Sequence, residues 1–313
     1  MAIASIPVQE GEKMGNSFAP LPDFAIGPDI PPSGYLTTDL GGGLYGVTSG
    51  LVNTMFLVTK QGVVVLDAPR DLGERLLTAI GGVTTKPVTH IVYSHAHADH
   101  IGSAHLFPGS PTVVAHELTG NLLKMASDPH RPLPNETFSG RRHVLDLGGE
   151  RLILEYPGDF HQPGNLFVHA PDHRVLAVID SFTVKSAPFF RLLFTSHVPT
   201  YTAALNWILD YPFETIVTGH MSQFGTSEDV ETTKEYVADL HSSAKRALQI
   251  VDYDDAVRHV PAENRQARLK VYVDTVTETA ADIMPTSWMN RLGGFDIFLK
   301  DNVNVVVWSL LND

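Results

Sequence analysis

Four side chains able to bind a metal ion lie within the segment 94–100, and this segment constrains the fold more than any other feature of the sequence. It reads Ser-His-Ala-His-Ala-Asp-His and supplies His95, His97, Asp99 and His100. An apolar run typical of a strand precedes it, and a pattern typical of a helix follows. Because residues two apart leave a strand end on the same side, the two histidines His95 and His97 are expected to face one metal ion. Asp99 and His100 can then face a second ion.

The chain has no cysteine among its 313 residues, so it has neither disulfides nor thiolate metal ligands nor a cysteine nucleophile. Any metal ion must therefore be held by imidazole and carboxylate groups, and 15 histidines make such a site feasible. Against 35 Asp and Glu stand 22 Lys and Arg, a formal charge of −13. This charge disfavours nucleic acid and anionic membrane surfaces as partners and leaves a small-molecule substrate as the expected partner.

A composition of 43% hydrophobic and 18% charged residues is typical of a globular chain and excludes disorder and coiled coil. The first twenty residues lack the basic and apolar regions of a secretory signal. No later run approaches the ~18 apolar residues of a membrane span. The sequence therefore predicts a cytoplasmic protein.

Three regions follow one another along the chain. Residues 1–40 are rich in proline and glycine and are expected to form an extended arm with no element longer than one turn. Residues 41–225 alternate strands with helices, and residues 226–313 carry long helical patterns at 228–250 and 263–283 before an apolar tail. This last region is expected to be mainly helical and to pack on the preceding one.

Short apolar runs place the expected strands at 44–48, 51–59, 63–67, 90–93, 112–115, 151–156, 166–170, 174–179 and 215–218. Helical spacing predicts helices at 117–126, at 201–209 and at 72–80, the last ended by Gly81 and Gly82. Two mixed β/α halves result. The helical spacing of apolar residues at 240–251 indicates a packing or dimer surface, and we expect a homodimer.

The segment 94–100 resembles the HxHxDH signature that metallo-β-lactamase-fold hydrolases carry at the end of a strand. The resemblance runs from about Gly43 to about His220. It implies an α/β fold, a four-layer αβ/βα sandwich of two mixed sheets flanked by helices, here with a helical C-terminal extension. Residues 41–225 would then be the catalytic domain.

The resemblance also implies the other ligands, each of which matches a residue after a later strand. His161 matches the third histidine of the first metal ion, Asp180 the bridging aspartate, and His220 the last histidine. Asp67 lies where the family keeps a carboxylate that orients a ligand imidazole. The implied first site is His95, His97 and His161, and the second is Asp99, His100 and His220, with Asp180 and a water bridging them. The carboxylates Asp99 and Asp180 are expected to serve catalysis as well.

This set implies two zinc ions per chain, with manganese or iron also accepted by such ligands. The implied activity is that of a di-zinc hydrolase in which a metal-bridging hydroxide attacks the carbonyl of a small, largely apolar ester, lactone or amide. Four aromatic residues, Phe182, Phe189, Phe190 and Phe194, follow the expected bridging aspartate and are expected to line the substrate pocket. Packing beneath that loop is the alternative.

The sequence leaves the substrate class open. Asp180 favours the broader hydrolases over the antibiotic-destroying enzymes, which generally lack it, and Thr183 stands where lactonases of the family typically have tyrosine. A phosphodiesterase with the same dinuclear site is one alternative. An iron-dependent oxygenase or redox protein is another, although His97 stands where flavodiiron members carry glutamate and so favours zinc hydrolysis.

Overall fold

The computed structural model describes residues 18–221 and 223–313, so the part of the expected arm within residues 1–17 lies outside the described residues. Its first sheet has seven strands in chain order. They are β1 Leu36–Gly41, β2 Leu44–Thr48, β3 Asn53–Val58, β4 Val63–Leu66, β5 Val88–Val92, β6 Thr112–His116 and β7 Glu136–Phe138. Strands β1 to β4 pair antiparallel and β4 to β7 parallel, so the sheet is mixed.

The second sheet has five strands in the order β12-β11-β10-β9-β8. They are β8 Arg142–Asp146, β9 Arg151–Glu155, β10 Phe167–Ala170, β11 Val175–Val178 and β12 Thr215–Val217. Antiparallel pairing runs from β8 to β11, and β11 pairs parallel with β12, so this sheet is mixed too.

The two sheets pack face to face through the side chains that alternate along their strands. In β3, Met55 and Leu57 lie in the core between the sheets, whereas Phe56 points to the opposite face. From the second sheet, Leu154 and Val168 enter the same core. This alternation with a period of two residues is what buries both faces of a strand.

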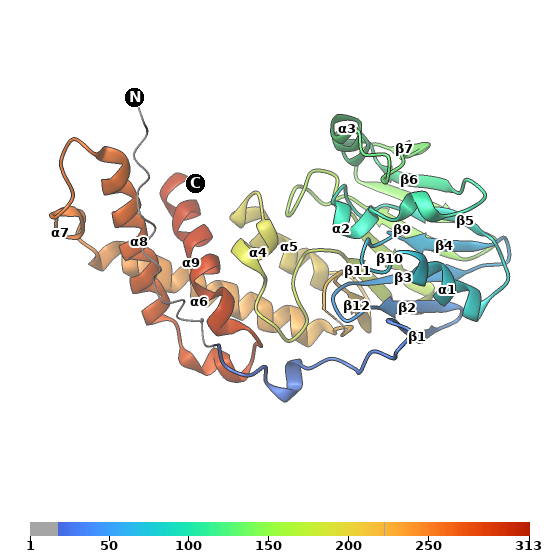
Figure 1. Ribbon diagram of the computed structural model, residues 1–313, viewed down its shortest axis with the longest axis horizontal. Coiled ribbons are helices and arrows are strands. Elements are labelled where there is room, and N and C mark those ends of the chain that lie inside the picture. Colours follow the sequence, from blue (N-terminus) through green and yellow to red (C-terminus); the bar gives the residue numbers. More distant parts are fainter. Residues whose placement is uncertain (1–17, 222) are drawn as a thin grey trace, which may run out of the picture.

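Helices cover the outer face of each sheet (Figure 1). The first sheet is covered by α1 Glu74–Val83, α2 Ala98–Ile101 and α3 Glu117–Ala126. The second is covered by α5 Val198–Leu209 and α6 Ser227–Ile250. The helices α8 Arg265–Ile283 and α9 Phe295–Asn312 pack on α6, with the short α4 Phe190–Phe194 against α9 and α7 Tyr253–Val257 against α8. The predicted four-layer fold with C-terminal helices is therefore confirmed. Within the described part of the chain, no helix combines the length and apolar character needed to cross a membrane.

Two local predictions are wrong. The first helix does not end at Gly81 and Gly82 but continues through them to Val83, because glycine costs a helix only about 1 kcal/mol and the buried Ile80 keeps this turn packed. Strand β1 begins at Leu36, within the segment 1–40 that was expected to have no element longer than one turn. It forms because a glycine turn at 41–43 folds it back onto β2.

Candidate metal centre

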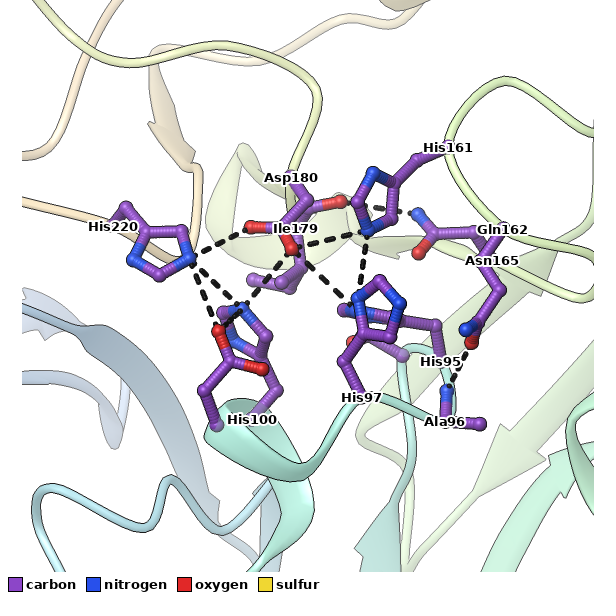
Figure 2. A network of polar contacts seen from close by, with 12 residues as sticks. His95, Ala96, His97, His100, His161, Gln162, Asn165, Ile179, Asp180 and His220 are labelled. Carbon is purple, nitrogen blue, oxygen red and sulfur yellow. Dashed lines mark hydrogen bonds and ion pairs between the residues drawn. The ribbon is translucent and has the colours of Figure 1, made fainter. Parts of the chain in front are cut away.

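Seven histidine and aspartate side chains converge at one end of the two sheets (Figure 2). Each is carried by the loop or helix start that follows a strand: the loop after β5 and the start of α2 carry His95, His97, Asp99 and His100, the β9–β10 loop carries His161, and the loops after β11 and β12 carry Asp180 and His220. The segment 94–100 and the family resemblance together predicted these seven residues, and the structure brings all seven together. Their donor atoms form two groups, His95, His97, His161 and Asp180 in one and Asp99, His100 and His220 in the other, each with its atoms within 4.8 Å of one another.

Asp180 lies between the two groups. Its Oδ2 is 3.5 Å from Nε2 of His95, 3.2 Å from Nε2 of His161 and 3.2 Å from Nε2 of His100. Its Oδ1 is 3.3 Å from Nε2 of His220. One carboxylate therefore reaches histidines of both groups, as a bridging ligand must.

Within each group the remaining donors also approach one another closely. Nδ1 of His97 is 3.0 Å from Nε2 of His161 in the first group. In the second, Nε2 of His100 is 3.2 Å from Nε2 of His220, and Asp99 Oδ2 is 3.4 Å from His100 Nε2. Once deprotonated, ring nitrogens this close to one another can bind a common metal ion.

The donor set fits divalent cations. Nε2 of His95 and Oδ1 of Asp180 are buried without a hydrogen-bond partner, which is costly unless another group satisfies them. Burial lowers the pKa of His95, and burial together with His161 lowers the pKa of His97 to about 4. These two imidazoles are therefore neutral at pH 7, the form that binds metal.

The second group holds more positive charge. Burial opposes protonation of His100, but Asp180 and Asp99 outweigh it and raise the pKa of His100 to about 9. Burial likewise opposes ionisation of Asp180, but His100 and His161 hold the pKa of that carboxyl well below its usual range. The carboxylates thus attract positive charge to this point, and a metal ion would displace the proton.

Backbone geometry at Gly219 brings the loops together. Gly219 has φ +92, and a Cβ there would lie 2.6 Å from Cγ2 of Ile179 and 3.0 Å from Cε1 of His100. Only glycine allows this conformation and this approach. The side chain of Asn165 donates to the Ile179 carbonyl at 3.1 Å and so fixes the chain directly before Asp180.

The position of His220 is fixed by Asn53, which sequence reasoning missed. The Asn53 side chain accepts a hydrogen bond from Gly219 N at 2.9 Å and donates to the carbonyls of His220 and Met221 at 3.1 and 3.0 Å. It reaches them from the first sheet, 166 residues away along the chain. No local sequence signal marks such a contact.

Asp67, expected to orient a ligand imidazole, is buried next to the centre and reaches His95 only through Ser94. Its carboxylate accepts from the backbone N–H and the hydroxyl of Ser94, at 2.7 and 2.6 Å, and the Ser94 Oγ is 2.8 Å from Nδ1 of His95. If the hydroxyl donates to Asp67, the His95 Nδ1–H must donate to Ser94, which leaves the Nε2 lone pair facing the centre. Burial raises the pKa of Asp67 to about 7, although His100 and Ser94 lower it.

The backbone between His95 and His97 is held from both sides. Ala96 N donates to the side chain of Gln162 at 2.8 Å, and the Arg131 guanidinium donates to the Ala96 carbonyl at 2.6 Å. Gln162 follows His161 directly, so this contact couples the loops of the first group. Neither contact was anticipated from the sequence.

A cavity of about 540 Å³ opens over the two groups. Its walls combine five of the seven residues, His97, Asp99, His161, Asp180 and His220, with the apolar side chains Phe189, Phe190, Leu193 and Phe194. Three of the four phenylalanines expected in the pocket therefore line it. Phe182 does not, because its side chain is fully buried in the core between the second sheet and the outer helices.

The apolar wall has an unusual backbone. Arg191, Leu192, Leu193 and Phe194 all have φ near +56, a left-handed turn that costs about 1–2 kcal/mol per non-glycine residue. Leu192 and Leu193 are buried, whereas Phe194 is 63% exposed at the cavity mouth. Such a conformation persists only where its surroundings hold it.

Comparison with known proteins agrees with this geometry. The model of the metallo-beta-lactamase superfamily matches residues 47–220, more than half of the chain. The chain belongs to this superfamily. Superfamily members are mostly metal-dependent hydrolases, and the histidine and aspartate cluster is compatible with a dinuclear metal centre.

Among curated relatives, the alpha subunit of 2,4-dinitroanisole O-demethylase from Nocardioides sp. (strain JS1661) is 28% identical over 62% of this chain and 60% of its own length. The beta subunit is 27% identical over 52% of this chain and 50% of its own length, so this chain spans only about half to three fifths of these relatives. Metallo-beta-lactamase IND-1 from Chryseobacterium indologenes is 27% identical over 50% of this chain and 65% of its own length.

Solved structures show the same fold. A metallo-beta-lactamase from Pontibacter korlensis superposes with a TM-score of 0.56 at 23% identity, covering 64% of this chain and 97% of that one. The C-terminal helices from α6 onward follow the region that the superfamily model matches.

Proposed function

We propose that this protein is a di-zinc hydrolase that cleaves a small, largely apolar ester, lactone or amide. The observation that carries the proposal is the position of the cavity, which has the two ligand groups as its floor and phenylalanines as its wall. His95, His97 and His161 would hold one ion, and Asp99, His100 and His220 the other, with Asp180 between them. When bound, the ions would supply a hydroxide nucleophile and polarise the substrate carbonyl.

Asp99 is the carboxylate of the site that is most exposed to the cavity. It lines the cavity with its side chain 54% exposed, whereas Asp180 is buried. Burial opposes its ionisation, but the hydrogen bond from His220 and the charge of His100 lower the pKa of Asp99 below its usual range. The ionised carboxylate can therefore accept a hydrogen bond from the attacking water and orient it toward the substrate.

The chemistry of the cavity wall supports an apolar substrate. Among the described residues that line it, none is lysine or arginine, and four are phenylalanine or leucine. A phosphodiester is an anion, and apart from the metal ions themselves no cationic side chain of this wall would pair with its charge. We therefore place acyl hydrolysis ahead of phosphodiester hydrolysis, and of iron-dependent chemistry with the same ligands.

A second candidate reaction is hydrolysis of an activated aryl methyl ether. Two of the relatives are named as subunits of 2,4-dinitroanisole O-demethylase, and the phenylalanine wall here suits an aromatic ring. Water would supply the oxygen of the phenol or of the methanol, and the two products account for all atoms of ether and water.

One panel of substrates tests both reactions. Proton release at constant pH is followed for phenyl acetate, γ-nonalactone, a β-lactam and bis(4-nitrophenyl) phosphate, and methanol release is followed for 2,4-dinitroanisole. Turnover of the ester or lactone, lost on chelation and restored by zinc, is the expected result. Turnover of the phosphate alone would refute acyl hydrolysis, and methanol release alone would favour the ether reaction. If the purified protein contained iron and hydrolysed none of these substrates, the proposal of a zinc hydrolase would be refuted.

A further inference from the structure

Asn302 is a fully buried polar residue in α9, far along the chain from the metal centre. Its side-chain oxygen accepts a hydrogen bond from Leu192 N at 2.8 Å, and its amide nitrogen donates to the Pro188 carbonyl at 2.8 Å. The same nitrogen lies 3.2 Å from the hydroxyl of Tyr236 in α6. One amide therefore spans the segment from Pro188 to Leu192, with both of its polar atoms used.

That segment is the apolar wall of the cavity. Between the two anchored residues lie Phe189, Phe190 and Arg191, and the left-handed turn at 191–194 contains the anchored Leu192. The Phe189 ring lies 5.5 Å from the imidazole of His220, so the wall begins next to the metal centre. A backbone held in a sparsely populated conformation needs a partner that fixes it, and Asn302 supplies that partner at Leu192.

A second side chain of α9 supports the aromatic rings themselves. Phe298 lies one helical turn before Asn302 and therefore on the same face of the helix. Its ring centroid is 5.4 Å from that of Phe189 and 5.2 Å from that of Phe190. One face of α9 thus holds the backbone of the wall through Asn302 and its rings through Phe298.

We propose that Asn302 is a positioning residue for substrate selectivity, which holds the phenylalanine wall so that the cavity prefers esters with an aryl group over small alkyl esters. The inference rests on the proposed function. It assigns a role in that function to the C-terminal helices, which lie outside the region shared with the superfamily. Asn302 touches neither ligand group and acts only through the wall.

The test compares Asn302→Ala with a matched control, Asn304→Ala. Asn304 is on the same helix and donates to Thr277 Oγ1 of α8 at 3.2 Å, away from the cavity. Phe298→Ala removes the ring support without leaving polar groups unpaired, and it tests the wall even if Asn302→Ala fails to fold. Zinc content and far-UV circular dichroism establish that each full-length variant is folded and loaded.

Kinetics with phenyl acetate and ethyl acetate give the decisive readout. For Asn302→Ala we expect KM for phenyl acetate to rise about tenfold with kcat changed less than about threefold, and ethyl acetate kinetics to stay close to those of the unchanged protein. The preference for the aryl ester therefore falls about tenfold, and Phe298→Ala lowers it in the same direction. Asn304→Ala keeps the preference. Equal losses with both esters, or an unchanged preference in both wall variants, would overturn the proposal.

Binding of acetophenone, followed by NMR titration of the zinc-loaded protein, separates this inference from the proposed function. If the unchanged protein hydrolyses neither ester, acyl hydrolysis is wrong, but the wall is still tested. Weaker acetophenone binding by about tenfold in Asn302→Ala, and not in Asn304→Ala, supports the positioning role. Equal affinity in all variants refutes it.

Discussion

Replacement of Asp67 by asparagine changes one proton next to His95 and leaves the shape of the site nearly unchanged. The asparagine oxygen can still accept from the Ser94 backbone N–H, but its NH2 group must donate to the Ser94 hydroxyl. That hydroxyl then donates to Nδ1 of His95, which moves the imidazole proton to Nε2. A protonated Nε2 facing the centre cannot bind a metal ion.

Groups that orient a metal-bound imidazole contribute about 10- to 100-fold to metal affinity. On this scale we expect Asp67→Asn to weaken zinc binding by about 100-fold, or about 2.8 kcal/mol. Ser94→Ala removes the link without imposing the wrong tautomer, and we expect a loss of about tenfold. Zinc affinity is measured by competition with a chromophoric chelator at pH 8, where Asp67, with its pKa of about 7, is ionised. The control is Ser243→Ala, a buried serine in α6.

A double-mutant cycle tests whether Asp67 acts on His95 through the Ser94 hydroxyl. Once Ser94 is alanine, Asp67 no longer reaches His95, so adding Asp67→Asn should weaken zinc binding by less than about threefold. The link through Ser94 would be refuted if the losses of zinc affinity from Asp67→Asn and Ser94→Ala were fully additive. It would also be refuted if Asp67→Asn bound zinc as tightly as Ser243→Ala.

Three further outcomes follow from the site. Asn53→Ala leaves the Gly219 N–H and the His220 carbonyl without their partner, so the free energy of unfolding measured in urea should fall by about 1–3 kcal/mol. An unchanged urea midpoint would show that Asn53 does not hold this loop. Arg131→Ala frees the Ala96 carbonyl between two ligands and should lower kcat/KM about tenfold at constant zinc content; full activity refutes its role. Phe194→Ala should change stability by less than about 0.5 kcal/mol yet raise KM for phenyl acetate; an unaltered KM removes Phe194 from the pocket.

The sequence predicts most of what is local. His95, His97, Asp99 and His100 share one short segment, and strands and long helices show their hydrophobic period directly. The three later ligands, His161, Asp180 and His220, come from the family resemblance and not from residue spacing. Each of the local signals lies within a few residues of the feature that it predicts.

Contacts between distant segments leave no such signal. The bond between Asn302 and Leu192 spans 110 residues, and nothing in the segment around Asn302, which also holds Asp301 and Asn304, indicates it. Phe182 was expected in the pocket because it is close in sequence to the other phenylalanines. The chain turns between them, however, and buries Phe182 on the helix-covered side of the second sheet. Tertiary packing decides both cases.

Metal dependence of acyl hydrolysis tests the central claim most directly. The measurement is proton release from phenyl acetate at constant pH, with the protein as zinc-loaded, chelator-stripped and zinc-restored samples whose metal content is determined in parallel. The account predicts two zinc ions per chain, no turnover after stripping and full recovery on reloading. Undiminished hydrolysis by folded, metal-free protein would contradict it.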